Sequence, residues 1–245
     1  MSNNIDLSIE KWCAWAPGVE KRQDWEAWAR GECNIMEQGT PDVTFVAPML
    51  RRRLSQLSRM ALYVANGCLE PQQSVATVFC SRHGELHRTV ELLQSIAEQE
   101  LLSPMGFSLS VPNTGSGLYS ISRKDTSVST VLSAGIDSFE QSFLEAAAVI
   151  KNEEEKKVLL VCCDMPLPSI FSRFKDKTEC LYGLAILLSG TGSGDKFNLS
   201  FSGNNGNAVT SGMRPLLFLK YLLSSNKYLA MHSNRLSWQF KRYVD

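Results

Sequence analysis

The sequence has 245 residues, of which 44% are hydrophobic and 20% are charged, with a formal net charge of +0. This composition is typical of an ordinary globular protein and argues against a nucleic-acid partner, which favours a basic surface. The sequence contains neither an apolar run of roughly 18 residues nor a signal-peptide pattern, so we expect a cytoplasmic protein without a membrane span.

The seven cysteines indicate a protein whose thiols are reduced. They are odd in number and scattered, and several, such as Cys80 and Cys163, stand among apolar residues as small core side chains do. No CxxC pair is present, and the pair His83 and His87 has no evident third ligand. We therefore expect neither a metal site nor a cofactor.

The first 42 residues are rich in tryptophan: Trp12, Trp15, Trp25 and Trp28. Large aromatic side chains of this kind usually fill a core. We interpret residues 1–42 as an N-terminal arm that packs onto the main body, with a short helix that starts near Gln23.

An apolar stripe at helical spacing predicts one helix between Pro48 and Gly67. Arg51, Arg52 and Arg53 fall in its first turn, where cations oppose the helix dipole, so this cluster gains nothing from its own helix. One interpretation is a solvated polar face. The other is a docking patch for an acidic partner.

Apolar and β-branched runs predict five strands, at 74–80, 127–132, 158–163, 181–189 and 197–201. Helical patterns alternate with them at 84–99 and 139–148, and a last helix and tail fill 203–245. On the helix at 84–99 we expect the apolar residues to face inward: Leu86, Val90, Leu93, Ile96 and Ala97. This order implies a single α/β domain over 1–245, with a mixed, mostly parallel sheet sandwiched by helices.

The stretch 127–148 has the build of an active site without its chemistry. A strand that ends at a helix N-terminus is where an α/β enzyme often carries a nucleophile, because the turn exposes the side chain and the positive helix end stabilises an anion. The residue at that turn is Leu132, which has no nucleophilic atom. A long loop rich in proline and glycine, 103–121, precedes this strand, and such loops are more often functional than idle.

Three segments resemble the N-terminal half of a β-ketoacyl synthase, an enzyme of the thiolase fold: SPMGFSLSVPNTGSGLYSI (103–121), SVSTVLSAGIDSFEQSFLEAA (127–147) and KVLLVCCDMPLP (157–168). In that family the nucleophile strand carries a cysteine in a Thr-Ala-Cys-Ser pattern. Thr130-Val131-Leu132-Ser133 stands in its place, so Leu132 occupies the cysteine position, while Asn113 matches an asparagine of the preceding loop. The family's C-terminal half, with two catalytic histidines, has no counterpart.

The motifs WAPG (15–18), PMLRRRLS (48–55), SRHGE (81–85) and SPMGFSLSVPN (103–113) are similar to those of short β-ketoacyl-synthase-like N-terminal domain proteins. These include the chain-length-factor-like subunits encoded in aryl polyene pigment clusters of Gram-negative bacteria. The resemblance covers most of 5–202. It implies a thiolase-like half fold and a non-catalytic partner of a full-length β-ketoacyl synthase, which together elongate polyene, polyketide or fatty acyl chains on acyl carrier protein.

The resemblance also implies the role of several residues. The nucleophile strand of such enzymes pairs with its counterpart across a dimer axis, which gives an interface at Ser127, Val128, Ser129, Thr130 and Val131. The preceding loop approaches the partner's acyl pocket and would do so here through Phe107, Ser110 and Asn113. Carrier protein would dock on Arg51, Arg52 and Arg53.

Two alternatives of other classes stay open. A thiol-dependent acyltransferase would need another cysteine: Cys163 lies in an apolar strand, where burial makes a thiol inert, while Cys80 has Arg82 and His83 nearby in sequence. A stand-alone adaptor would bind acyl carrier protein through Arg51–Arg53 and need no ketosynthase.

Overall fold

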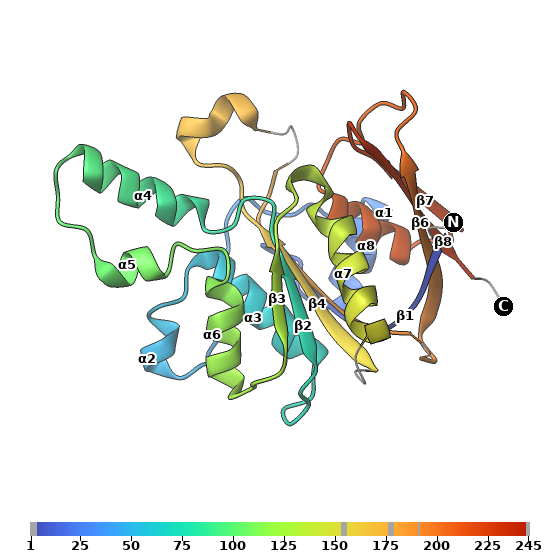
Figure 1. Cartoon of the computed structure of the whole chain (residues 1–245), viewed down its shortest axis with the longest axis horizontal. Coiled ribbons are helices and arrows are strands. Elements are labelled where there is room, and N and C mark those ends of the chain that lie inside the picture. Colours follow the sequence, from blue (N-terminus) through green and yellow to red (C-terminus); the bar gives the residue numbers. More distant parts are fainter. Residues whose placement is uncertain (1–3, 153–155, 176–178, 191, 244–245) are drawn as a thin grey trace.

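The structure is a computed structural model that describes residues 4–152, 156–175, 179–190 and 192–243. Its strands form one eight-stranded sheet in the order β3-β2-β4-β5-β1-β6-β8-β7 (Figure 1). The strands are β1 (Asn4–Trp15), β2 (Ala76–Cys80), β3 (Ser129–Leu132), β4 (Lys157–Asp164), β5 (Tyr182–Ser189), β6 (Asp195–Gly203), β7 (Tyr228–His232) and β8 (Leu236–Arg242).

The helices include both long covering elements and short turns. They are α1 (Arg22–Arg30), α2 (Pro48–Arg51), α3 (Gln56–Cys68), α4 (Leu86–Ala97), α5 (Pro104–Ser108), α6 (Thr114–Arg123), α7 (Ser138–Asn152) and α8 (Arg214–Leu222), with the 3-10 turns η1 (Gly135–Asp137) and η2 (Ser169–Phe174). None of the helices among the described residues is long and apolar enough to span a membrane.

The sheet is mixed, as predicted, but the expectation that most of it is parallel is wrong. Only β3, β2 and β4 run parallel to one another, and all other neighbouring pairs of the described strands are antiparallel. Parallel neighbours need a crossover connection. Helical crossovers connect β2 to β3, through α4, α5 and α6, and β3 to β4, through α7. The later strands are antiparallel to their neighbours, and α8 is the one α-helix described among them.

Helices cover both faces of the sheet, as predicted. Successive side chains of a strand point to opposite faces, so Val78 packs in one core with Phe143 of α7 and Phe218 of α8. Its neighbour Phe79 packs in the other core with Met60 of α3 and with residues of α6. The two clusters of buried apolar side chains enclose β2, β4 and β5 between the helices on either face.

The prediction of an N-terminal arm is wrong for residues 4–15. It forms β1, which lies between β5 and β6 inside the sheet. Trp15 is buried in a core, and the indole of Trp25 on α1 donates a hydrogen bond to the carbonyl of Ala14 at 3.0 Å. The helix expected near Gln23 is confirmed and ends at Gly31, whose φ of 80° suits glycine. At the other end, the expected tail forms β7 and β8.

Candidate functional site

The turn between β3 and α7 is built as the sequence predicts. Leu132 is the last residue of β3, lies opposite Cys80 of β2, and is half-buried. Ser133 follows it and donates its hydroxyl to the carbonyl of Ser81 at 2.9 Å. η1 then leads into α7, where Ser138 Oγ accepts from the backbone N–H of Ala134 at 2.9 Å. A hydrocarbon side chain thus stands at the end of the strand that leads into α7.

β3 is an edge strand, which bears on the interface predicted at 127–131. Among the described strands it pairs only with β2. The carbonyl of Val128 accepts from the backbone N–H of Thr77 in β2 at 2.9 Å, and that of Leu132 accepts from the N–H of Ser81, directly after β2, at 3.4 Å. Backbone groups of a strand alternate in direction, so those of Ser129 and Val131 point away from β2. The strand therefore leaves a row of unpaired donors and acceptors at the rim of the sheet.

The loop residues predicted to meet an acyl chain lie on and after α5. Phe107 is 62% exposed, and Ser110 is half-buried and donates its hydroxyl to the Phe107 carbonyl at 2.8 Å. Asn113 is exposed at the start of α6, where its backbone carbonyl accepts from Ser116 Oγ at 3.0 Å. Its side chain does not cap the helix. Phe107 and Asn113 are therefore open to solvent, whereas Ser110 is partly covered.

The arginine cluster lies differently from the prediction of one helix over 48–67. α2 ends at Arg51, and α3 starts after Ser55, whose hydroxyl accepts from the Ser58 N–H at 2.9 Å. This cap begins a second helix, so the cluster occupies the turn between two helices and not the first turn of one. Arg52 and Arg53 are exposed and Arg51 is half-buried.

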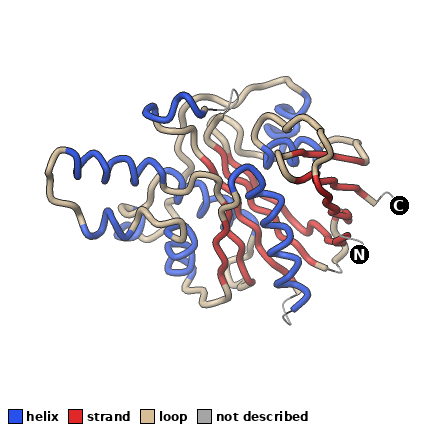
Figure 2. Tube along the Cα trace, turned by 45° about the horizontal axis from the view of Figure 1, so that its top comes forward, coloured by secondary structure: helices blue, strands red, loops and turns tan. Residues whose placement is uncertain are grey.

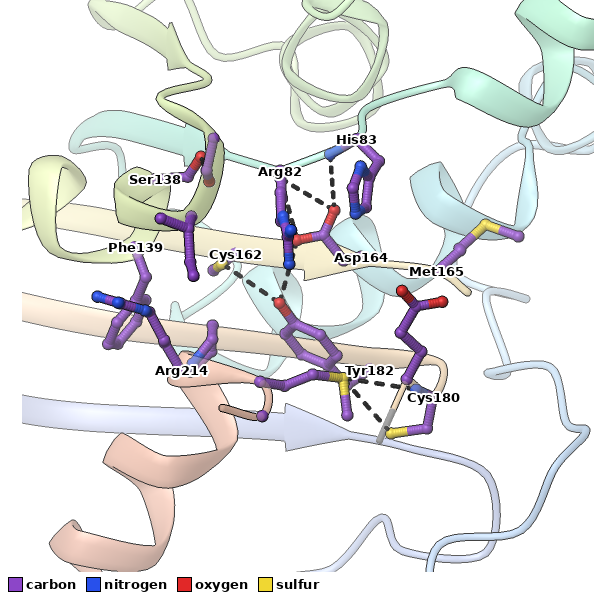
Figure 3. Close-up of a pocket in the computed structure, with 16 residues that line it drawn as sticks. Arg82, His83, Ser138, Phe139, Cys162, Asp164, Met165, Cys180, Tyr182 and Arg214 are labelled. Carbon is purple, nitrogen blue, oxygen red and sulfur yellow. Dashed lines mark hydrogen bonds between the residues drawn. The ribbon is translucent and has the colours of Figure 1, made fainter. Parts of the chain in front are cut away.

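A pocket at the carboxyl ends of β2 and β4 contains a polar network that sequence reasoning missed (Figure 3). Asp164 ends β4 and accepts from Ser81 Oγ at 2.6 Å, from the backbone N–H groups of Arg82 and His83 at 3.0 and 3.1 Å, and from the hydroxyl of Tyr182 at 3.1 Å. A polar residue directly after an apolar strand was the signal that could have revealed it. The network fixes the loop that leaves β2.

Withdrawal from water shifts the ionisation of this network. Burial raises the pKa of Asp164 above its ordinary value, against its hydrogen bonds from Ser81 and the backbone. Burial also raises the pKa of Tyr182 far above its ordinary value, so its hydroxyl stays protonated and donates. With these donors and acceptors already engaged with one another, the arrangement acts as a brace between β2, β4 and β5.

A second group of charges lies beside this pocket. Arg214, which begins α8, is buried and its Nη1 lies 2.5 Å from Glu140 Oε1 and 3.4 Å from Asp137 Oδ1. Its Nη2 donates to the carbonyl of His232 at 2.6 Å, and Trp238 Nε1 donates to Asp137 at 2.9 Å. Burial raises the pKa of Glu140 from 4.5 to about 7, although Arg214 opposes this. These contacts tie the start of α7 to α8 and to β8.

The cysteines considered as alternative nucleophiles are buried. Cys80 and Cys163 line one small cavity together with Val131 and Pro112. Burial raises the pKa of Cys163 well above its ordinary value, and that of Cys162 beside it likewise. Thiols in this state are poor nucleophiles. Cys80 lies at the end of β2, covered by its neighbours in β3 and β4.

The histidines are distributed over separate contacts. His87 Nε2 lies 2.8 Å from the carbonyl of Pro166, and His232 Nδ1 lies 2.9 Å from Ser237 Oγ. Within the described part of the chain, no group of three histidine, cysteine, aspartate or glutamate side chains is arranged to hold a metal ion.

The chain was compared with known proteins. It matches the family described as beta-ketoacyl synthase, N-terminal domain, over residues 25–241. A chain of the complex of the ketosynthase ApeO with its chain length factor ApeC from Xenorhabdus doucetiae is 30% identical, with a TM-score of 0.86 over 97% of this chain and 100% of that chain. No curated protein sequence matches.

Two more distant structures share the fold. The ishigamide ketosynthase/chain length factor is 14% identical, with a TM-score of 0.66 over 82% of this chain and 68% of that chain. A chain of AntDE:AntF, a type II PKS acyl-carrier protein in complex with its ketosynthase, is 12% identical, with a TM-score of 0.70 over 98% and 99%. The predicted thiolase-like fold is thereby confirmed. The chain belongs to the β-ketoacyl synthase N-terminal domain family.

Proposed function

We propose that this chain is a non-catalytic, chain-length-factor-like partner of an active β-ketoacyl synthase. The heterodimer elongates polyene, polyketide or fatty acyl chains carried on acyl carrier protein. The observation that carries this proposal is Leu132, a hydrocarbon side chain at the turn where the family holds its nucleophile. The motifs at 48–55 and 103–113 support the aryl polyene type within this class.

The chemistry of condensation explains why Leu132 is decisive. The reaction needs a thiolate to carry the acyl chain, and imidazoles to activate the malonyl unit and stabilise oxyanions. Leucine can neither attack a thioester nor be acylated. The thiols on the neighbouring strands β2 and β4, Cys80, Cys162 and Cys163, are buried. Burial holds the thiol pKa of Cys163 well above its ordinary value.

The free edge of β3 supports association. An unpaired strand rim is a template for pairing with another chain, and stable proteins cover it. The similar chain from Xenorhabdus doucetiae was solved in a complex of a ketosynthase with its chain length factor. An active ketosynthase that pairs with β3 would supply the missing cysteine and histidines.

Co-expression with a full-length β-ketoacyl synthase of the aryl polyene type tests this proposal. We expect the two chains to purify together as a heterodimer, and native mass spectrometry should give one copy of each. The interface should exceed roughly 2,000 Å², as obligate complexes do. Purification of this chain as a stable monomer in the presence of the ketosynthase would overturn the proposal. Binding of carrier protein by that monomer would favour the adaptor alternative.

We expect the isolated chain to accept no acyl group. Incubation with acyl thioesters should leave its intact mass unchanged, because Leu132 cannot be acylated and the buried thiol of Cys163 stays protonated. Leu132→Cys alone should not produce condensation, because the resemblance finds no counterpart of the family's two catalytic histidines in this sequence. Stoichiometric acylation of the wild-type chain would refute this expectation and support the acyltransferase alternative.

Ser110→Phe should shorten the products of the heterodimer. Ser110 follows the exposed α5 and is half-buried. We expect a phenyl ring at this position to extend toward the acyl pocket of the ketosynthase and to shorten it. Liquid chromatography and mass spectrometry of the products should show fewer extension cycles, with the complex intact. Ser108→Phe is the control, because Ser108 is exposed at the end of α5, two residues before Ser110. Unchanged product length in every variant of this loop would contradict the role assigned to it.

Charge reversal of Arg51, Arg52 and Arg53 to glutamate should slow association with acidic carrier protein. The deficit should shrink as salt rises, because the Debye length falls to about 8 Å at physiological ionic strength. Stopped-flow measurements at low and high salt provide the comparison. A control with the same change in net charge reverses three exposed cations in and beside the β7–β8 hairpin: Lys227, Arg235 and Lys241. An unchanged association rate at low salt would mean that the three arginines form only a solvated polar face.

A further inference from the structure

The segment between β2 and α6 forms a projecting arm, which we define as α4 and α5 with the turn between them, residues 86–108. In Figures 1 and 2 it extends from the body on the side where β3 is the edge of the sheet, away from the two chain ends. All 12 residues of α4 are described and none of them is buried. The prediction that its apolar face lies inward is therefore wrong.

Apolar side chains are concentrated on this arm. Leu93 is 56% exposed, Ile96 is 54% exposed and Leu101, in the turn, is fully exposed. Met105 and Phe107 of α5 are also exposed. Helices of soluble proteins bury such a face, and exposed apolar patches mark sites of interaction. A partner that covers these side chains removes them from water.

Exposed apolar side chains also occur between the arm and β3 along the chain. Val111 lies between the arm and α6, Ile121 lies on α6, and Val128 directly precedes β3, and all three are exposed. In Figure 1 the arm extends on the side of the molecule where β3 is the edge of the sheet. We therefore take the arm and the free edge of β3 as parts of one binding surface.

The root of the arm is fixed by a polar network. Glu85 is buried and accepts from Ser55 Oγ at 2.7 Å and from Ser58 Oγ at 3.0 Å, both at the start of α3. Arg88 Nη2 donates to the carbonyl of Arg53 at 2.8 Å. His87 Nε2 lies within hydrogen-bond distance of the carbonyl of Pro166, in the segment after β4. The arm is thus presented in a set direction, which reduces the ordering entropy lost on binding.

The charges of the arm select its occupant. Glu91, Glu98 and Glu100 are exposed, whereas Arg88 is half-buried beside Glu85. This acidic border disfavours an acidic carrier protein by like-charge repulsion. It suits a partner whose apolar face is bordered by basic side chains.

We propose that the α4–α5 arm is a second binding element, which lies across the surface of the ketosynthase that pairs with β3. This inference rests on the proposed function, because it takes the ketosynthase as the chain at β3. The contacting face of the ketosynthase is apolar, with basic side chains opposite the three glutamates. The arm and the strand edge together hold the heterodimer.

The test replaces three exposed apolar residues of the arm: Leu93→Ser, Ile96→Ser and Leu101→Ser. These side chains are solvent-exposed in the free chain, so its thermal unfolding should not change. Mass photometry of the co-purified heterodimer over a dilution series should show a dissociation constant raised at least about tenfold, as loss of interface anchors does. The control replaces exposed apolar residues far from the arm in sequence: Met36→Ser, Val209→Ser and Tyr228→Ser. It should dissociate as the wild type does.

The outcomes separate this inference from the proposed function. If the wild-type heterodimer forms and the arm variant has the same dissociation constant as the wild type, the inference fails and the proposed function stands. If the wild-type chain does not bind the ketosynthase, both fail. If the arm variant instead loses self-association of this chain, the occupant is a second copy and the inference is overturned.

Discussion

Ser129→Pro is expected to abolish the heterodimer while leaving this chain folded. The backbone of Val128 and Leu132 bonds to β2, so the alternation of the strand directs the N–H of Ser129 outward, to the free edge. Proline removes that donor and adds a ring at a rim where the next strand lies about 4.8 Å away. The dissociation constant should rise by at least about a hundredfold, since the ring blocks the register as well as one hydrogen bond.

Two matched variants make this result interpretable. Ser129→Ala keeps the N–H and should retain the complex. Thr130→Pro removes a donor that faces β2 and should destabilise the chain itself, which thermal unfolding detects. A Ser129→Pro chain that still forms a heterodimer stable to dilution would show that β3 is not the pairing edge.

Arg214→Met should destabilise the chain by about 3–5 kcal/mol, because it leaves the buried carboxyl of Glu140 without its cation. The pKa of Glu140 is already raised to about 7 by burial, and removal of the guanidinium raises it further. Because the pKa of Glu140 is 4.5 in the unfolded chain and about 7 in the folded chain, the folded state holds a proton that the unfolded state has lost between these pH values. The free energy of unfolding therefore falls as pH rises from 4.5 through 7. The deficit of the variant should therefore be larger at pH 8 than at pH 5.

Urea unfolding at the two pH values measures this difference. The double variant Arg214→Met with Glu140→Leu should recover much of the stability, since an apolar pair replaces both charges. Arg22→Met removes an exposed partner of Glu26 and should have little effect. A deficit that is equal at pH 5 and pH 8 would mean that Glu140 is not the group left uncompensated.

The sequence by itself determined the local elements and the identity of the residue at the turn. Apolar runs such as Val158–Cys163 have the length and composition of buried strands, so β4 was predictable from its own residues. The same holds for α7 and for the position of Leu132, because a strand, a turn and a helix follow each other within a short stretch. β1 was missed, although Ile5, Leu7 and Ile9 alternate with polar residues as a strand requires.

Only the tertiary structure decided which distant segments meet. The position of β1 between β5 and β6 depends on pairing between residues more than 160 positions apart. Arg214 and Glu140 are 74 residues apart, and no spacing rule connects them. The helical period of α4 correctly indicated an apolar face, but a period does not say whether that face meets its own core or another chain. Burial is a property of the whole fold, and in α4 the fold leaves that face open.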